Sequence, residues 1–146
     1  MDSCSKSIVI RSGDFTGEGS SRLNIVDSSG SSITESPRAT LEKSPGSKLI
    51  TSNRPTLVES ANSTIHNCDG GIITRSPGTY TEDSSDVKVT NSPNTKVIDS
   101  IDANVVESPG AHLETAAGSE VVRTPNIHLV NEQNARYVNG VKVILN

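Results

Sequence analysis

The stretch Val105-Val106-Glu107-Ser108-Pro109-Gly110-Ala111-His112 is one copy of an eight-residue unit that runs through the whole chain in one register. Its residues are, in order, aliphatic, variable, charged, serine, proline, glycine, small and polar, and we label these positions a to h, counting from Met1. A further copy, Val121 to His128, begins sixteen residues later. Because position a is mostly aliphatic and position d mostly serine, this repeat constrains the fold more than any local motif.

The composition alone would fit a disordered chain, since 32% of the residues are hydrophobic and 2% are aromatic. A disordered tract, however, has no reason to hold a register, so we expect one folded domain over residues 1–146. The net charge of -4 gives no overall basic footprint for nucleic acid. No apolar run is long enough to span a membrane as a helix, and the first ten residues lack the features of a signal peptide. The localisation is left open and includes an extracellular filament or a virion.

The period of eight fits neither an amphipathic helix nor a coiled-coil heptad. It fits a short β-strand, predicted at positions g to c, followed by a tight turn at positions d to f. Proline at e followed by glycine at f indicates a type II turn, in which the second central residue needs a positive φ. Each octad therefore predicts one strand and one turn.

Alternate octads differ in their turns, which makes the true repeat sixteen residues long. One set has proline at position e five times, whereas the other set has it only at Pro37. We predict an all-β, single-chain parallel β-solenoid with two strands and two tight turns per coil, and about nine coils. A coil of three octads would mix the two turn types. It would also stack like charges, namely Glu35, Glu59, Asp83 and Glu107.

The predicted core is thin, because two sheets face each other across about 10 Å. Position a should form its aliphatic ladder, which in one sheet consists of Val9, Ile25, Leu41, Leu57, Ile73, Val89, Val105 and Val121. Position d should turn inwards as a ladder of small hydroxyls that satisfies buried turn backbone, consisting of Ser28, Ser44, Ser60, Ser76, Ser92 and Ser108. Cys4 and Cys68 share this position. We interpret them as buried free thiols, because no CxxC or histidine pairing suggests a metal or redox site.

Sequence motifs for catalysis are missing. The glycine-rich stretch Gly13 to Gly19 has neither the lysine nor the following helix that phosphate binding needs, and we interpret it as a turn in an imperfect coil. Carboxylates lie on regular ladders, and uninterrupted octads leave no room for the long loops that build a groove. We therefore expect that the chain is not an enzyme and that it uses no cofactor and no metal.

Two groups of charged or titratable side chains recur at the sixteen-residue spacing. Lys6, Arg22, Arg38 and Arg54 share one turn position, and we interpret them as a solubilising edge, with contact to a polyanion or glycan as the alternative. His112 and His128 share position h, close to Glu114. We interpret the two histidines as solvated, with a metal ion or an acid sensor as the alternative.

One outward column is apolar along most of its length. It is position b of the octads with Pro-Gly turns, and we predict a lateral interface between solenoids at Val58, Val106, Val122 and Val138. The other interpretation is β-propensity alone, but a contiguous apolar stripe more often marks an interface.

The coil of two octads is similar in layout to bacterial ice-nucleation solenoids, although the TxT arrays of those proteins are missing here. Octapeptide repeats also occur in the intertwined trimeric β-helices of phage tail spikes. Those repeats typically place glycine two residues after the aliphatic residue, where this chain has a charge.

We expect a structural, self-assembling protein, the subunit of a filament or fibre whose partner is another copy of itself. Neither end of the register shows a capping repeat, and the last ten residues lose the Ser-Pro-Gly turn while becoming more apolar. Subunits should then stack head to tail through Val141, Val143 and Leu145. The alternatives are a phage or viral fibre or spike segment, which includes a trimeric β-helix, and a surface module that binds a glycan or ice.

Overall fold

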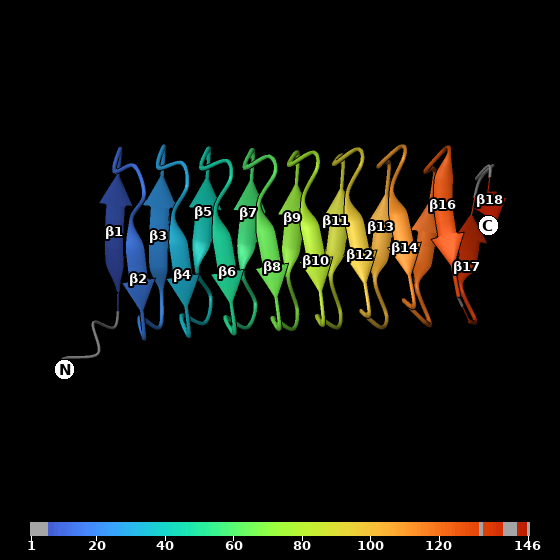
Figure 1. Cartoon of the computed structure of the whole chain (residues 1–146), viewed down its shortest axis with the longest axis horizontal. Helices are drawn as coiled ribbons and strands as arrows, with labels where there is room; N and C mark the ends of the chain where they lie inside the picture. Colours follow the sequence, from blue (N-terminus) through green and yellow to red (C-terminus); the bar gives the residue numbers. More distant parts are fainter. Residues whose placement is uncertain (1–5, 132, 139–142, 146) are drawn as a thin grey trace.

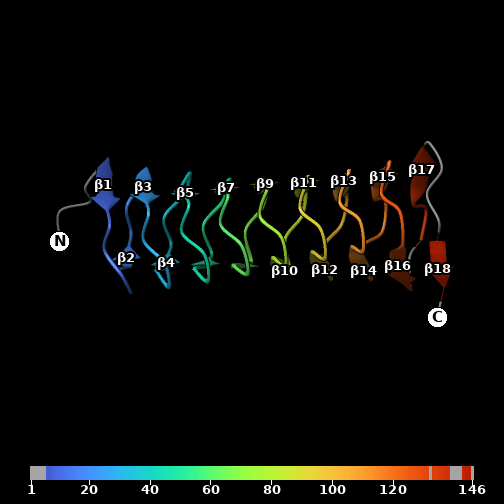
Figure 2. The ribbon, with the colours of Figure 1, turned by 90° about the horizontal axis from the view of Figure 1, so that it is seen from above.

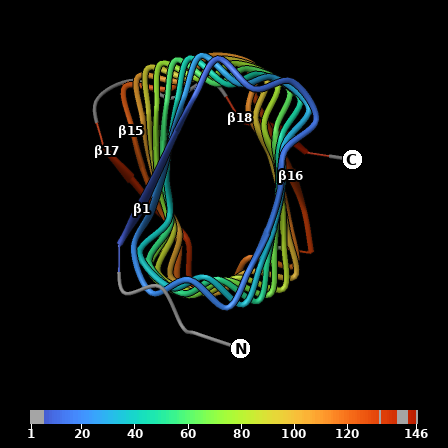
Figure 3. The same ribbon diagram turned by 90° about the vertical axis from the view of Figure 1, so that its left-hand side faces the viewer.

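The computed structural model describes residues 6–131 and 133–138, together with the backbone of residues 143–145. Within these residues the chain winds into a rod in which two parallel nine-stranded sheets face each other (Figures 1 and 2). Each strand pairs with the strand two further along the chain, and paired residues are sixteen apart, as in Leu41 and Leu57. Seen from the N-terminal end, the chain runs clockwise as it recedes (Figure 3). The solenoid is therefore right-handed, the hand that parallel crossover connections adopt.

Sheet 1 holds the odd-numbered strands and sheet 2 the even-numbered ones. Sheet 1 consists of β1 (Ser7–Ile10), β3 (Leu23–Val26), β5 (Thr40–Glu42), β7 (Thr56–Val58), β9 (Ile72–Thr74), β11 (Lys88–Thr90), β13 (Asn104–Val106), β15 (Glu120–Val122) and β17 (Arg136–Val138). Sheet 2 consists of β2 (Thr16–Glu18), β4 (Ser32–Thr34), β6 (Lys48–Ile50), β8 (Thr64–His66), β10 (Tyr80–Glu82), β12 (Lys96–Ile98), β14 (His112–Glu114), β16 (Ile127–Val130) and β18 (Val143–Leu145). The predicted fold class, a parallel β-solenoid with sixteen-residue coils, is confirmed.

The strands are shorter than the sequence predicts, because position c belongs to the turn and position g lies outside most strands. Lys43 at position c has φ 49°, and Gly46 at position f has φ 70°, so most octads bend through two left-handed residues. The left-handed conformation costs a non-glycine residue about 1–2 kcal/mol. Backbone pairing between coils offsets that cost, since the Lys43 N–H donates to the Val58 carbonyl at 3.0 Å. The prediction that position c extends the strand is wrong for this reason.

The core is a double row of aliphatic side chains between the sheets. In sheet 1, position a is fully buried from Ile25 to Val121, whereas Val9 is half-buried and packs against the same cluster. Position a of sheet 2 faces it with buried Ile33, Leu49, Ile65, Val97 and Leu113. Alternation of inward and outward side chains on three-residue strands leaves one buried position for each strand.

The serines at position d form a second buried row at the turns. Ser28, Ser44, Ser60, Ser76, Ser92 and Ser108 are all fully buried. The Ser44 N–H donates to Ser60 Oγ at 3.0 Å, and the Ser60 hydroxyl donates to the Val58 carbonyl at 3.0 Å. Each buried hydroxyl therefore satisfies the position d amide of the preceding coil and a carbonyl of its own coil.

The glycine-rich stretch near the start of the chain is an altered coil. Gly17 stands at position a of sheet 2, where most other coils carry an aliphatic side chain. A Cβ at Gly17 would lie 2.8 Å from Phe15 Cε1 and 2.7 Å from Leu23 Cδ2. The partly buried Phe15 ring therefore fills the space that the missing side chain leaves.

Candidate functional site

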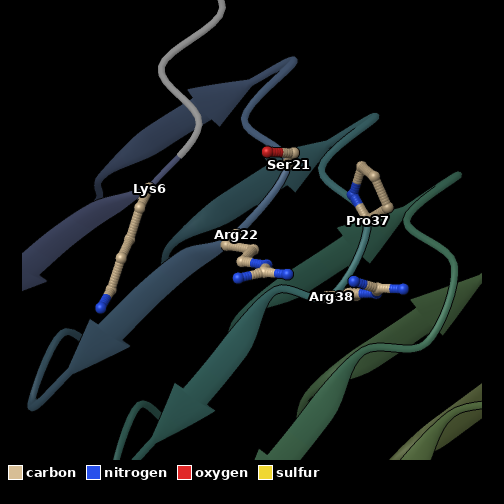
Figure 4. Close-up of a pocket in the computed structure, with 5 residues that line it drawn as sticks. All are labelled: Lys6, Ser21, Arg22, Pro37 and Arg38. Carbon is tan, nitrogen blue, oxygen red and sulfur yellow. The ribbon is translucent and has the colours of Figure 1, made fainter.

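A row of exposed cations lies along one edge of the rod, where sheet 2 leads into sheet 1. Lys6, Arg22, Arg38 and Arg54 precede β1, β3, β5 and β7, one for each coil. We call these four residues the basic edge. A surface depression of about 670 Å³ lies along it, lined by Lys6, Ser21, Arg22, Pro37 and Arg38. Figure 4 shows the three cations of the depression side by side on successive coils.

The cations of the basic edge have no carboxylate partner among the described residues. All seven ion pairs found within the described part of the chain involve other side chains. The contrast is clear at position c of sheet 1, where Arg75 Nε lies 3.1 Å from Glu59 Oε1 and Arg123 Nη2 lies 2.7 Å from Glu107 Oε1. The fold thus pairs one column of arginines internally and leaves another open to solvent.

Two of the open arginines also hold an unusual backbone conformation. Arg38 and Arg54 have φ values of 61° and 58° at a position that elsewhere in the described chain holds glycine, aspartate or asparagine when φ is positive. Their N–H groups donate to the carbonyls of Asn53 and Asp69, at 2.8 Å and 2.6 Å. These backbone hydrogen bonds between coils stabilise the left-handed turn, and the arginine side chains extend from it into solvent.

The sign of the edge reverses further along the rod. The same turn position holds Gly70, then the exposed Asp86 and Asp102. The basic edge is thus confined to the first four coils, and it spans about 14 Å, three steps of about 4.8 Å.

The outer face of sheet 1 carries the predicted lateral residues. Val58, Val106, Val122 and Val138 are half-buried there, on β7, β13, β15 and β17. The same face exposes Ile8, Ile10 and Ile72, which are 59%, 61% and 45% accessible. The outer face of sheet 2 has no exposed large hydrophobic side chain among the described residues. Sheet 1 therefore presents the more apolar of the two flat faces.

The two histidines singled out in the sequence contact each other. The rings of His112 and His128 stack with centroids 4.9 Å apart, and their Nδ1 atoms are 2.9 Å apart. His112 Nε2 also lies 3.5 Å from Glu114 Oε2. One Nδ1 must donate and the other accept, so at least one ring is neutral in this arrangement. In the described part of the chain, no three His, Cys, Asp or Glu side chains form a group that could hold a metal ion.

Cys68 is a buried free thiol that takes the place of a serine at position d. The Ser52 N–H points to its Sγ at 3.1 Å, and the thiol points to the His66 carbonyl at 3.1 Å. Burial raises the pKa of Cys68, and the contacts to Ser52 and His66 oppose that rise in pKa. The thiol is therefore held in its neutral form. Cys4 lies outside the described residues.

Some predicted residues are not tested by this geometry, and some lining residues were missed. Val141 lies outside the described residues, and Val143 and Leu145 belong to β18, whose backbone pairs with β16. Their role in an end-to-end contact stays a prediction. Sequence reasoning found the four cations but missed Ser21 and Pro37, although both occupy position e beside them. No helix long and apolar enough to cross a membrane occurs in the described segments.

Comparison with known proteins supports the fold and gives no family. No protein-family model matches the chain, and no curated protein matches it. Among solved structures, the periplasmic alginate epimerase AlgG is similar over 90% of this chain, with a TM-score of 0.61 and 12% identity. This chain spans about half the length of that structure, 47%. QnrB1, a plasmid-mediated fluoroquinolone resistance protein, aligns over 97% of this chain and 91% of its own, with a TM-score of 0.40 and 10% identity.

A phage protein also appears among the similar structures. Tailspike protein 2 of Escherichia coli O157:H7 bacteriophage CAB120 aligns over 86% of this chain and 26% of its own, with a TM-score of 0.33 and 12% identity. At such identities the likeness to AlgG establishes the β-solenoid fold alone. It nevertheless corrects one expectation, that the chain is not an enzyme. AlgG is an enzyme built on this fold, so regular coils do not exclude catalysis.

Proposed function

We propose that this chain is a rigid segment of a fibre or spike, and that it associates with copies of itself through the outer face of sheet 1. The observation that carries the proposal is one uncharged outward column of that face, position b from β7 to β17. It consists of Val58, Thr74, Thr90, Val106, Val122 and Val138. The equivalent column of sheet 2 includes His66, Glu82 and Glu114.

The proposal is supported by the way in which flat β-faces associate. Two such faces can pack about 10 Å apart with interdigitating side chains, as in a β-sandwich. A second copy presents the same uncharged column, so the contact would be self-complementary, as in most homo-oligomers. The rod would then gain lateral partners without any change in its coils.

Two matched double variants test this contact. Val106→Glu with Val122→Lys places opposite charges on sheet 1, and Ile50→Glu with Ile98→Lys does the same on sheet 2. The full chain should form assemblies in light scattering and electron microscopy, the sheet 1 variant should be monomeric, and the sheet 2 variant should match the parent. Circular dichroism checks that both variants keep the β-solenoid.

Two outcomes would contradict the proposal. One is a parent chain that stays monomeric at high concentration, and the other is an equal loss of assembly in both variants. Long fibres would support lateral growth of a filament, whereas particles of one defined size would support a closed spike such as a trimer. An end-to-end contact through Val141, Val143 and Leu145 remains a separate prediction.

A further inference from the structure

We propose that the basic edge binds a short stretch of a linear polysaccharide that carries carboxylate or sulfate groups. The four cations Lys6, Arg22, Arg38 and Arg54 are exposed, lie on successive coils and have no acidic partner among the described residues. This surface is distinct from the outer face of sheet 1, so the proposal does not depend on self-association.

The spacing of the cations suits a regular polyanion. Successive coils are about 4.8 Å apart, so the edge offers a positive charge at each step. An extended polysaccharide with one anionic group per sugar residue presents negative charges at a comparable interval. Guanidinium groups bind carboxylate and sulfate oxygens in a bidentate way, and several weak contacts on one chain add up through effective concentration.

The lack of a partner within the rod distinguishes the arginines of the basic edge from other left-handed arginines. Arginine at Arg38 and Arg54 occupies a left-handed position where glycine or asparagine would be less strained. At position c, Arg75 and Arg123 are also left-handed, but each has a glutamate partner within the rod. The arginines of the basic edge lack such a partner, so no ion pair within the described rod accounts for their charge.

The surroundings favour a polysaccharide over a nucleic acid. The depression is lined by three cations, a serine and a proline, so it offers no aromatic ring on which a base could stack. The chain as a whole carries a net charge of -4, which opposes wide contact with a polyphosphate. Pro37 adds a small apolar surface beside the arginines. The C–H groups on the apolar face of a sugar ring could pack against it.

The reversal of charge along the edge limits the length of the bound segment. Gly70 ends the row of cations, and the exposed Asp86 and Asp102 that follow would repel an anionic chain. The site should therefore hold about four sugar residues, one for each cation. Affinity for a series of oligosaccharides should rise up to about that length and then level off.

Two variants with the same net charge test the site in the full chain. Arg22→Gln with Arg38→Asn and Arg54→Asn removes three cations of the basic edge. Arg11→Asn with Arg75→Asn and Arg123→Asn removes three arginines from position c, and Asn91 already occupies that position. Binding is measured by calorimetry at low ionic strength with oligogalacturonate, dextran sulfate and neutral dextran, and thermal unfolding of each variant confirms that it is folded.

The expected result is binding of a charged polysaccharide and none of neutral dextran. An exposed charged contact accounts for at most about fivefold in affinity, so the basic edge variant should bind more weakly by up to about 100-fold. The position c variant should stay within about threefold of the parent, and replacing Arg22, Arg38 and Arg54 by lysine should give an intermediate loss. A preference for oligogalacturonate would identify a carboxylate ligand, and a preference for dextran sulfate would identify a sulfate ligand.

Several results would overturn the proposal. Equal weakening in the two triple variants would show attraction to the net charge alone. Tighter binding of a single-stranded oligonucleotide with the same number of charges would show that the edge selects phosphate polymers. Failure of the parent to bind either charged polysaccharide at low ionic strength would show that the basic edge is not a polysaccharide site.

Discussion

The backbone N–H of Ser76 donates to the Oγ of Ser92, sixteen residues further along the chain, at 3.0 Å. The Ser92 hydroxyl in turn donates to the Thr90 carbonyl at 2.9 Å. One small side chain therefore satisfies a buried amide of the preceding coil and a carbonyl of its own coil. The same arrangement recurs at the turns that follow both sheets, as at Ser36 and Ser44.

Replacing Ser92 should therefore destabilise the solenoid. Ser92→Ala leaves the buried Ser76 amide without an acceptor and should lower the free energy of unfolding by about 1–3 kcal/mol. Ser92→Lys buries an unpaired charge and should unfold the surrounding coils. Asn91→Lys is the control, because Asn91 is exposed and Lys43 occupies the same position in another coil. Urea unfolding followed by circular dichroism compares the three, and similar midpoints for all would contradict the buried role.

Thr81 is a polar residue at a core position, and removing its hydroxyl should stabilise the protein. Its Oγ1 is buried and has no hydrogen-bond partner among the described residues. Thr81→Val should raise the free energy of unfolding by about 1 kcal/mol, because an unsatisfied hydroxyl is replaced by a methyl group. Thr79→Val is the matched control, since Thr79 Oγ1 donates to the Ser76 carbonyl at 2.7 Å. The control should lose stability, and a loss in both variants would show that the Thr81 hydroxyl is satisfied in solution.

Gly17 and Phe15 should behave as one packing unit. Gly17→Val would bring its side chain against Phe15 and Leu23, and overpacking of this kind costs about 1–3 kcal/mol. Phe15→Ala should also destabilise, because it leaves the space beside Gly17 empty. The double variant should lose less stability than the sum of the two, since each change relieves the other. Chemical denaturation of the four proteins measures this coupling, and strict additivity would show that Phe15 does not fill the space at Gly17.

The buried thiol of Cys68 should make stability fall at alkaline pH. Because burial raises its pKa in the folded state, the neutral thiol contributes fully at pH values below the ordinary thiol pKa. As pH rises through the interval between the unfolded and folded pKa values, the unfolded chain loses its proton first, and stability falls by at most about 1.4 kcal/mol per pH unit. The Cys68→Ser variant should lack this alkaline loss of stability, because it has no thiol to titrate. Unfolding measured across alkaline pH in reducing buffer compares the two, and parallel curves would contradict the assignment.

Periodicity made the architecture predictable, because each coil repeats the same choice of inward residue. Ser76 and Ser92 could be assigned to one buried row from their spacing alone. The end of each strand could not be assigned, since Arg, Asp, Lys, Glu and Asn alternate at position c and none of them signals a left-handed residue in the way that glycine does. The packing role of Phe15 could not be predicted either, because Phe15 fills the space at Gly17 from a different position of the repeat.

The sequence predicts that the cations of the basic edge share one column, but it does not predict whether they have acidic partners. Spacing places Arg22, Arg38 and Arg54 on one edge, yet it does not say whether Glu35 or Asp69 reaches them. Only the turn geometry shows that the arginines stay unpaired in the described chain while Arg75 and Arg123 are paired. The same limit explains the wrong expectation about enzymes, since regular coils describe the scaffold and not the chemistry that a scaffold carries.

The alternating charges at position c also restrict how such a chain can lengthen or shorten. Arg11, Asp27, Lys43 and Glu59 alternate in sign from coil to coil, and the pairs Arg75 with Glu59 and Arg123 with Glu107 join neighbouring coils. Loss or duplication of one complete coil would keep every strand in register but place like charges next to each other. Loss or duplication of two coils would preserve both the register and the alternation. Gene duplication in this part of the chain should therefore be tolerated best in steps of two coils.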